Sequence, residues 1–359
     1  MNVVHFTAFS PGKSGMYEST KDQIKYERRE GLDSNLIDNL RSEDEYVGRI
    51  DDGWLETIQW RKALDAGVWV IHSGLPPPLK DYIIKNRDKH VVISILHGPC
   101  ETMILKEFSE MLRSEHEPAF SVQHINSIWD YDACVVLNQH EYDISILYDE
   151  HDRLVYIPNS IDLERYEPAS EKNLAWDYAN RPAILSCDVP RLEKIPVHIL
   201  FAMPKIIERI PTARLNMFAL PLHDIEFFRN LICRSKKMQL DFDCTENIAM
   251  KSNTLAPLMR GGDIGFNSNY TGIASRVSME MMAMGVPVVS YNGDYTKYHA
   301  KIFDLESIAE QIELCWNDLQ GTDLKQKTIE YARKRYDRSV YVKEYVKLYQ
   351  KLMEGKNGN

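Results

Sequence analysis

A glycine-rich turn, SPGKSGMYES at residues 10–19, follows the apolar run NVVHFTAF and suggests a site for a phosphate group. A Walker-type triphosphate loop needs a further glycine five residues before the GKS triplet, and Thr7 occupies that position. A helix that begins near Gly12 and Gly15 could still receive a phosphate or a sugar hydroxyl, because its first amides are unpaired. The alternative is an ordinary tight turn between a strand and a helix.

Histidines follow two other apolar runs. His97 ends HVVISIL and precedes Gly98 and Pro99, so it would lie at the carboxyl end of a strand, where parallel sheets bind ligands. An imidazole there could contact or protonate a reacting sugar or phosphate. The alternative is a histidine that only satisfies loop carbonyls. His72, after VWVI, has a similar place, but no glycine follows it directly.

Two cations, Arg191 and Lys194, lie in DVPRLEK between the apolar run AILSC and a predicted helix. In front of a helix N-terminus they could bind a diphosphate through charge-assisted hydrogen bonds, each worth about 1.5–3 kcal/mol. The alternative is a solvated helix start, because the segment RLEK is common.

The most informative stretch is NYTGIASRVSMEMMAMGVPVVS at residues 269–290. A polar loop leads into a helix whose interior holds Glu280; the loop consists of Thr271, Gly272, Ile273, Ala274 and Ser275. A carboxylate among apolar neighbours is costly unless it is paired, and two ribose hydroxyls would pair with it. The alternative places Glu280 on the exposed face of an amphipathic helix, with Val277, Met281 and Met284 in the core.

The elements that would position these residues form two successive α/β patterns. In the first half we expect strands at NVVHFTAF, VWVI, HVVISIL, DACVVLN and LVYIPNSID, with a helix at MYESTKDQIKYERREG that ends at Gly31. After the polar segment LERYEPASEKNLAWDYANRP we expect strands at AILSCD, ARLNMFAL, MQLDFD, DIGFNS and VPVVSYN, and helices at VHILFAMPKIIERIP and SRVSMEMMAMG. The tail reads as two helices with a break near Tyr336 and Asp337. This order predicts an α/β protein with two doubly wound Rossmann-like domains and a ligand in the cleft between them.

Composition limits the class of protein. The chain has 359 residues, 44% hydrophobic and 27% charged, which is typical of a globular protein with two domains. Its net charge of -10 argues against general binding of polyanions, although a local basic groove stays open. The six cysteines form no C-x-x-C pair and indicate buried thiols of a reducing compartment. We see no signal peptide and no apolar run of about 18 residues, so we expect a cytoplasmic protein, in the host cell if the source is viral.

Five segments, in order, resemble the retaining glycosyltransferases of the GT-B fold, the large family four: SPGKSGMYES, LHGP, YIPNSIDLERYEP, RLEK and TGIASRVSMEMMAMGVPVVS. IPNSIDLERYEP is similar to the family segment IPNGVDLERF, and MEMMAMGVPVVS is similar to LEAMACGTPVVA. The likeness extends from Asn2 to the tail helices. It implies an acceptor domain at residues 1–168, a nucleotide-sugar donor domain at 169–335, and a C-terminal helix at 336–359 that packs back on the first domain.

The resemblance also implies roles for the residues singled out above. The loop that ends at Gly15 would face the donor phosphates and the acceptor, and His97 would lie near the transferred sugar. Lys194, with Arg191, would hold the donor diphosphate. Glu280 matches the second glutamate of the family's E-x7-E motif, which binds the ribose, and the amides of residues 271–275 would approach the sugar and phosphate.

Two departures from the family pattern stand out. The first glutamate of E-x7-E is replaced by Gly272, or by Thr271 after a one-residue slip, and in the family that carboxylate contacts the sugar. Its loss would change the donor sugar, or slow or abolish transfer. The family arginine five residues before the lysine is Val189 here, so Arg191 would have to act from a shifted position.

The resulting hypothesis is a metal-independent glycosyltransferase without a cofactor, which moves a sugar from a nucleotide-diphosphate donor, a UDP-sugar in preference to a GDP-sugar. Retention of anomeric configuration is implied by the resemblance alone. The acceptor could be a glycan, a small molecule or modified DNA, and the sequence indicates no oligomeric state.

Two alternatives stay open. The size and the HGP-E and GMYEST segments also resemble phage enzymes that glycosylate a modified base such as hydroxymethylcytosine, which would need a cationic groove on this acidic chain. The other alternative is a nucleotide-sugar binding protein that lost catalysis with the missing glutamate. An epimerase or phosphorylase on the same fold is a weaker alternative, because we find no motif for a lysine-bound pyridoxal group.

Overall fold

The computed structural model divides into two compact units, Met1–Asn159 with Arg338–Asn359, and Ser160–Asp337. Ile161, at the start of the second unit, packs in the core of that unit and donates its amide hydrogen to the Tyr336 carbonyl. The structure describes residues 1–7, 15–37, 65–72, 82–97, 131–146, 149, 152–168, 181–188, 194, 196–217, 252–270, 274–291, 293 and 295–357.

The first unit contains a six-stranded sheet in the order β2-β1-β3-β4-β5-β6, with every neighbouring pair parallel. Its strands are β1 (Asn2–Phe6), β2 (Asp33–Ile37), β3 (Val68–Ile71), β4 (Val91–Leu96), β5 (Ala133–Val136) and β6 (Leu154–Tyr156). Four of them are the apolar runs predicted to be strands, together with the start of NVVHFTAF. The exception is β2, whose polar sequence DSNLI lies at the sheet edge and was not predicted.

Side chains alternate between the two faces of this sheet, as the period of a strand requires. Val3, Val70 and Ile93 contribute to one buried core, and Val4, Ile71 and Val92 to the other. Both faces are therefore apolar, which explains why the strands read as continuous hydrophobic runs.

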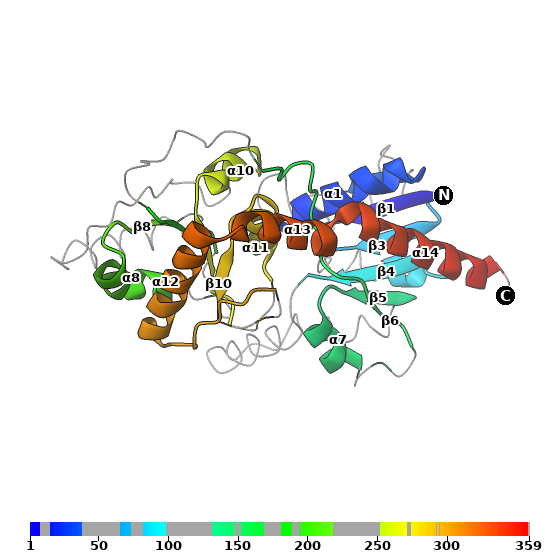
Figure 1. The fold of residues 1–359 in the computed structure, drawn as a ribbon. Coiled ribbons are helices and arrows are strands. Elements are labelled where there is room, and N and C mark those ends of the chain that lie inside the picture. The colour runs from blue at the N-terminus through cyan, green and yellow to red at the C-terminus, as the bar shows by residue number, and fades with distance from the viewer. Residues whose placement is uncertain are drawn as a thin grey trace, which may run out of the picture. The chain divides into compact units, whose positions relative to one another are not determined.

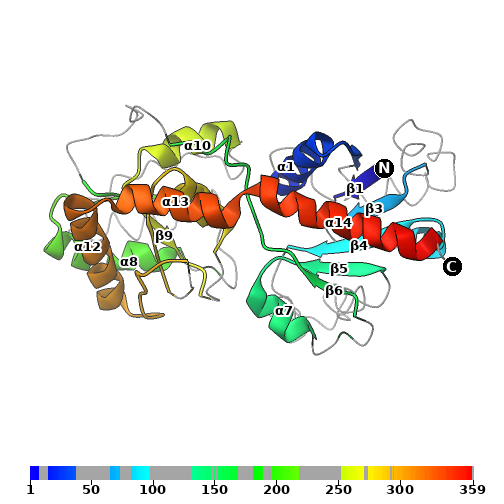
Figure 2. The same cartoon turned by 45° about the vertical axis from the view of Figure 1, so that its right-hand side comes forward.

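In the described part of the first unit the helices are α1 (Gly15–Arg29), α7 (Gln139–Ser145) and α14 (Arg338–Asn357). Gly31, with a φ of +85°, follows α1 in the left-handed conformation that ends helices. The red helix α14 runs beside the blue α1 in both ribbon views (Figures 1 and 2), and its Tyr345 and Tyr349 pack in the core that holds Val3 and Val70. The last helix of the chain thus completes the first unit.

The second unit contains a parallel four-stranded sheet in the order β10-β9-β7-β8. Its strands are β7 (Ala183–Ser186), β8 (Arg214–Met217), β9 (Ile264–Asn267) and β10 (Val288–Ser290). The strand expected at MQLDFD, residues 238–243, lies outside the described residues.

The named helices of the second unit are α8 (Val197–Arg209), α10 (Ser252–Arg260), α11 (Arg276–Ala283), α12 (Leu305–Gly321) and α13 (Leu324–Tyr336). Helix α8 continues through Pro204, and Gly285 follows α11 with a φ of +83°. The predicted break in the tail is confirmed, because α13 ends at Tyr336 and α14 begins at Arg338.

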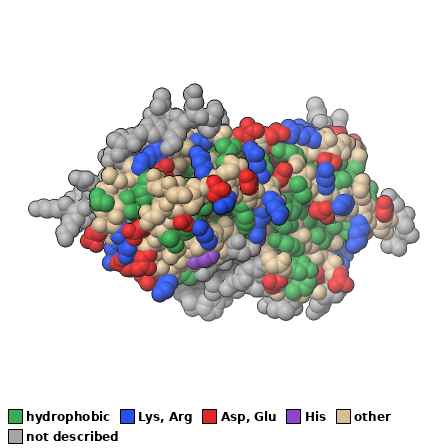
Figure 3. Space-filling model, in the orientation of Figure 1, with side chains coloured by type: hydrophobic (Ala, Val, Ile, Leu, Met, Phe, Trp, Pro, Cys, Tyr) green, Lys and Arg blue, Asp and Glu red, His purple; other side chains and the backbone are tan. Residues whose placement is uncertain are grey.

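Charged side chains of both signs are interspersed over the described surface in Figure 3. Among the described residues, none of the helices combines the length and apolar character that crossing a bilayer would require.

Candidate functional site

The carboxyl ends of β7 and β9 bring together a set of polar groups centred on Asp188. The two strands are neighbours, and Leu185 is in register with Gly265, so Asp188 lies level with Ser268. One carboxylate oxygen of Asp188, Oδ1, accepts from Lys194 Nζ at 2.9 Å. The other, Oδ2, accepts from the amide and the hydroxyl of Ser268 at 2.9 and 3.0 Å. Asp188 therefore ties the predicted cation to the loop after β9.

Lys194 lies where its ammonium can meet a ligand. An isolated antiparallel bridge joins its backbone to Asn269, which fixes the segment after β7 against the loop after β9. Its side chain is 17% exposed, whereas that of Asp188 is 3% exposed. An ammonium has three donor hydrogens, and the bond to Asp188 uses one of them. The arrangement is suited to holding an anion at the edge of the sheet.

Glu280 is buried in α11, so the alternative that placed it on an exposed helix face is wrong. Its Oε1 accepts from Arg276 Nε at 2.7 Å, a pair four residues apart on the same helix. The Tyr166 hydroxyl also bonds to this carboxylate, and burial together with the negative charge of Glu280 raises the pKa of the Tyr166 phenol. The protein itself thus supplies partners that make a buried carboxylate tolerable.

The buried thiol of Cys187, the neighbour of Asp188, packs in the same core as Met279 and Met281, which flank Glu280. Burial raises the pKa of Cys187 well above its ordinary value, and the carboxylates of Asp188 and Glu280 raise it further. Both carboxylates are therefore close enough to act on the same sulfur. We call Asp188, Lys194, Ser268, Arg276 and Glu280 the edge cluster.

Helix α11 begins at Arg276, so its N-terminus is part of this cluster. Ser275 is the N-cap of the helix, and its hydroxyl accepts from the Ser278 amide at 3.2 Å and bonds to the Ser278 hydroxyl at 2.9 Å. Ala274 precedes this cap. The remaining predicted donor-site residues, Arg191, Thr271, Gly272 and Ile273, lie outside the described residues.

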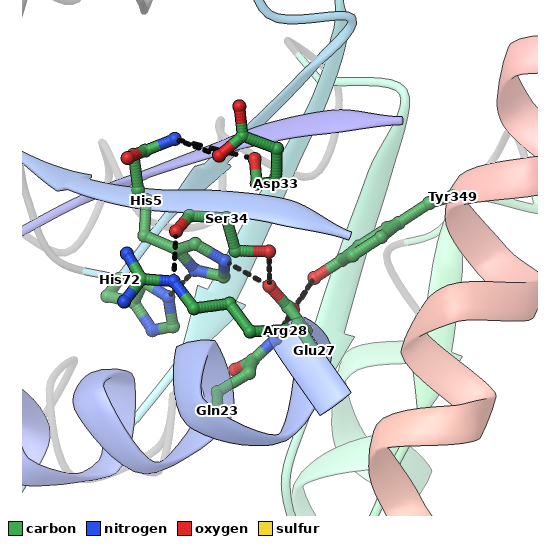
Figure 4. Close-up of polar contacts among 9 residues, drawn as sticks. His5, Gln23, Glu27, Arg28, Asp33, Ser34, His72 and Tyr349 are labelled. Atoms are coloured by element: carbon green, nitrogen blue, oxygen red, sulfur yellow. Dashed lines mark hydrogen bonds and ion pairs between the residues drawn. The ribbon is translucent and has the colours of Figure 1, made fainter. Parts of the chain in front are cut away.

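In the first unit, His97 is the end of a chain of three histidines. Its Nε2 lies 3.0 Å from His72 Nδ1, and His72 Nε2 lies 2.8 Å from His5 Nδ1. His5 Nε2 lies 2.7 Å from Glu27 Oε2. Figure 4 shows His5 between His72 and the carboxylate of Glu27. We call Glu27, His5, His72 and His97 the histidine chain. The predicted residue Gly15 is the first residue of α1, the helix that carries Glu27.

Glu27 is fully buried, and the protein donates four hydrogen bonds to it. Gln23 Nε2 and the Tyr349 hydroxyl donate to Oε1 at 3.0 and 2.8 Å, and the Ser34 hydroxyl donates to Oε2 at 2.7 Å beside His5 (Figure 4). Burial by itself would raise the pKa of Glu27, but the charge of His5 and the hydrogen bonds from His5, Ser34 and Tyr349 outweigh it and lower the pKa. The carboxylate therefore stays ionised inside the core.

Sequence reasoning missed Asp188, His5 and Glu27. The strand period held a signal for the histidines: His5, His72 and His97 each follow an apolar residue of one sheet face by two positions, namely Val3, Val70 and Ile95. Asp188 could have been found as an acidic residue at the end of the apolar run AILSC. Within the described part of the chain, no three His, Cys, Asp or Glu side chains gather as a metal site would require.

Comparison with known proteins finds proteins similar to this chain by structure and none by sequence. No family model and no curated protein sequence matches the chain. Among solved structures, it is similar to sucrose-phosphate synthase from Thermosynechococcus elongatus, with a TM-score of 0.73, 12% identity, and coverage of 99% of this chain and 100% of that one. It is also similar to HepE from Anabaena in complex with UDP-glucose, with a TM-score of 0.70, 13% identity, and coverage of 98% and 100%.

A third similar structure is the pneumococcal O-GlcNAc transferase GtfA in complex with UDP and GlcNAc, with a TM-score of 0.57 and 10% identity. Here the match covers 80% of this chain and 57% of that chain. Because these likenesses involve the whole length of this chain in the first two cases, they confirm the predicted GT-B architecture of two doubly wound α/β units.

Proposed function

We propose that this protein is a glycosyltransferase that takes a sugar from a UDP-sugar donor. The observation that carries the proposal is the edge cluster, in which Asp188 fixes Lys194 at the carboxyl edge of the sheet and Glu280 is buried in α11, the helix capped by Ser275. A cation, a helix N-terminus and a buried carboxylate match the diphosphate and the ribose of a nucleotide sugar.

Lys194 would neutralise the diphosphate. Its charge matters most when the bond between the sugar and the diphosphate breaks, because negative charge then accumulates on the leaving group. Asp188 holds the ammonium at 2.9 Å and is itself fixed by Ser268, so the cation is positioned before a ligand arrives. Arg191, three residues before Lys194, is proposed as a second contact to the diphosphate.

Glu280 would bind the ribose hydroxyls. Its bonds to Arg276 and Tyr166 orient the carboxylate and spread its charge, and an ionised carboxylate has about four lone-pair sites for donors. The proposal therefore does not require Glu280 to give up its partners. The amides at the start of α11, near Ala274 and Ser275, would approach the donor phosphate.

The sugar itself would be handled by His97 of the first unit and by the loop Thr271, Gly272 and Ile273. Gly15, at the start of α1, would allow a ligand to approach that helix N-terminus closely. Gly272 replaces a carboxylate that the resembling family uses on the sugar, so we propose a donor sugar that makes fewer polar contacts, or a slower enzyme. We further propose retention of configuration and transfer without a metal.

Three of the similar structures favour uracil as the donor base. HepE was solved with UDP and glucose and with UDP-glucose, and GtfA was solved with UDP and GlcNAc. These ligands belong to proteins that share only the fold with this chain, so the nucleotide must be tested directly.

Calorimetry with uridine, UMP, UDP and GDP tests the proposal. We expect UDP to bind more tightly than UMP, and UMP more tightly than uridine, because each phosphate adds a charge-assisted contact at Lys194. Incubation with UDP-[14C]glucose and UDP-[14C]GlcNAc should then release labelled sugar slowly in the absence of an acceptor. Binding without any turnover would support the nucleotide-sugar binding protein, and an absence of UDP binding would disprove both.

A further inference from the structure

The three histidines of the histidine chain come from three neighbouring strands of the first unit. The sheet order places β1, β3 and β4 side by side, with His5 in β1, His72 directly after β3 and His97 directly after β4. His5 is in register with Val70, and Ile71 is in register with Ser94. Each step across the sheet therefore advances two residues toward the carboxyl edge. The imidazoles stay on one face and form a diagonal from the buried core to the half-buried His97.

With Glu27 ionised, the hydrogen bonds allow one arrangement of protons in which all three rings are neutral, and a second kind in which one ring carries an extra proton. In the first, Glu27 accepts from His5 Nε2, so His5 Nδ1 must accept from His72 Nε2, and His72 Nδ1 must accept from His97 Nε2. All three imidazoles are then neutral, and His97 Nδ1 carries a lone pair. In the second, the charge can rest on any of the three rings, and both bonds between histidines are reversed when it rests on His5. His5 is then an imidazolium beside Glu27, and His97 Nδ1 carries a hydrogen.

We propose that Glu27, His5 and His72 form a proton relay that sets whether His97 Nδ1 accepts or donates a hydrogen bond toward the sugar. The inference rests on the proposed function, which assigns His97 to the transferred sugar. Glu27, His5 and His72 are positioning residues in this scheme, because they act only through His97.

The relay moves one proton in three balanced steps. His97 Nδ1 takes a proton from a hydroxyl or from water. His97 then passes its Nε2 hydrogen to His72 Nδ1, and His72 passes its Nε2 hydrogen to His5 Nδ1. The positive charge ends on His5, where the Glu27 carboxylate lies 2.7 Å away. The reverse sequence returns a proton to the group that faces His97, so no other reactant is needed.

The charges around the chain favour this end point. Burial, and then the charges of His5, His97 and Arg338, lower the pKa of His72 well below its ordinary value, so the proton does not rest there. Glu27 stays ionised for the reasons given above. Among the described residues, the titratable and charged groups that act on the histidine chain are Glu27 on α1, His5 on β1, His72 and His97 directly after β3 and β4, and Arg338, Tyr345 and Tyr349 on α14. Because burial disfavours a charge on His72, the proton enters at His97 and is held at His5.

Nuclear magnetic resonance of the ¹⁵N-labelled histidine rings tests the relay on the whole protein without any need for activity. Between about pH 5 and pH 9 the ring nitrogens of His5, His72 and His97 should change together at one midpoint, because the three rings share a single proton. Glu27→Gln removes the negative charge that holds this proton, so the shared midpoint should fall by about one pH unit or more. Glu30→Gln, an exposed neighbour beyond the same helix, should leave it unchanged.

Two further variants keep the test decisive if Glu27→Gln fails to fold. Glu27→Asp keeps the charge and should restore the shared step. His72→Asn interrupts the chain, so His97 should then titrate separately from His5. Three independent midpoints in the wild type, or a His97 midpoint that ignores both Glu27→Gln and His72→Asn, would overturn the relay.

The pH profile of sugar transfer separates the relay from the proposed function. If Glu27→Gln shifts both the histidine midpoint and the acid limb of activity in the same direction, the relay serves transfer. A shifted midpoint with an unchanged profile would leave the relay standing and would contradict the role of His97 in transfer. A missing shift in the histidine spectra disproves the relay whatever the activity.

Discussion

The histidine chain and the edge cluster have similar places in their units but differ in what surrounds their charges. Each combines residues at or near the carboxyl ends of parallel strands with residues of a helix, α1 in the first unit and α11 in the second. Glu27 is fully buried and receives four hydrogen bonds from the protein, whereas Lys194 keeps 17% of its side chain exposed. We infer that the first arrangement chiefly supports stability and protonation, and that the second chiefly supports ligand binding.

The largest expected effect is the loss of stability on removing the buried carboxylate. Glu27→Ala leaves the donors of Gln23, Ser34, His5 and Tyr349 without an acceptor, and we expect a loss of about 3–5 kcal/mol in the free energy of unfolding. Urea unfolding measures it, with hydrogen exchange to localise the loss to α1 and α14. Lys194→Ala should cost less in the same assay, because Ser268 still donates two hydrogen bonds to Asp188. Similar losses for both variants would remove the distinction between the two clusters.

Because the pKa of Glu27 is lowered, the stability that its carboxylate contributes depends on pH. A carboxylate whose pKa is lower in the folded state contributes stability that is fully present above its unfolded pKa of about 4.3. That contribution disappears as the pH falls through the folded pKa. Below about pH 4 the wild type should therefore lose stability more steeply than Glu27→Gln, as thermal melts at successive pH values would show. Parallel slopes for the two proteins would contradict the lowered pKa.

At the edge cluster the next largest effect concerns the diphosphate. Lys194→Ala should weaken UDP binding by about 1.5–3 kcal/mol, or roughly 10- to 150-fold, because one charge-assisted contact is lost. Uridine has no phosphate, so its affinity should barely change. Calorimetry on both ligands checks this, and Lys343→Ala on the exposed side of α14 is the matched control. Equal losses for UDP and uridine would exclude Lys194 from the diphosphate site.

The smallest expected effect concerns the ribose. Glu280→Ala should weaken the binding of uridine and UDP alike by about 1–3 kcal/mol, because hydroxyl pairing is lost. Arg276→Ala should have a smaller effect, because Tyr166 still holds the carboxylate. Calorimetric titration of both variants with uridine and with UDP measures these losses. Unchanged affinity in Glu280→Ala would show that Glu280 does not bind the ribose and that it serves only to pair with Arg276 and Tyr166.

The sequence predicts the architecture well because apolar runs report burial directly. Strands β1, β3, β4, β5 and β7 all lie within predicted apolar segments, and Gly31 and Gly285 end α1 and α11 as predicted. Strand β2 was missed because Asp33, Ser34 and Asn35 resemble a turn, and only pairing with β1 makes them a strand. Tertiary context decided that element, as it commonly does for edge strands.

The candidate site was predicted only in part, for a related reason. Lys194 and Glu280 stand in recognisable segments, and the structure pairs the first with Asp188 and the second with Arg276. The partners of Glu27 could not be predicted, because the Tyr349 hydroxyl that donates to it lies 322 positions away in the chain. Local sequence patterns identify residues whose side chains could take part in chemistry. The long-range hydrogen bonds of the fold then determine which partner each of these residues has.

The place of α14 in the first unit has a consequence for biosynthesis. A ribosome releases the chain from its N-terminus, so the strands of the first unit emerge long before residues 338–357. Until then Val3, Val70 and Ile93 lack the helix that covers them, and Glu27 lacks Tyr349. The first unit therefore cannot complete its core until residues 338–357 have been synthesised. Nascent chains stalled before residue 338 should need chaperones to stay free of aggregates.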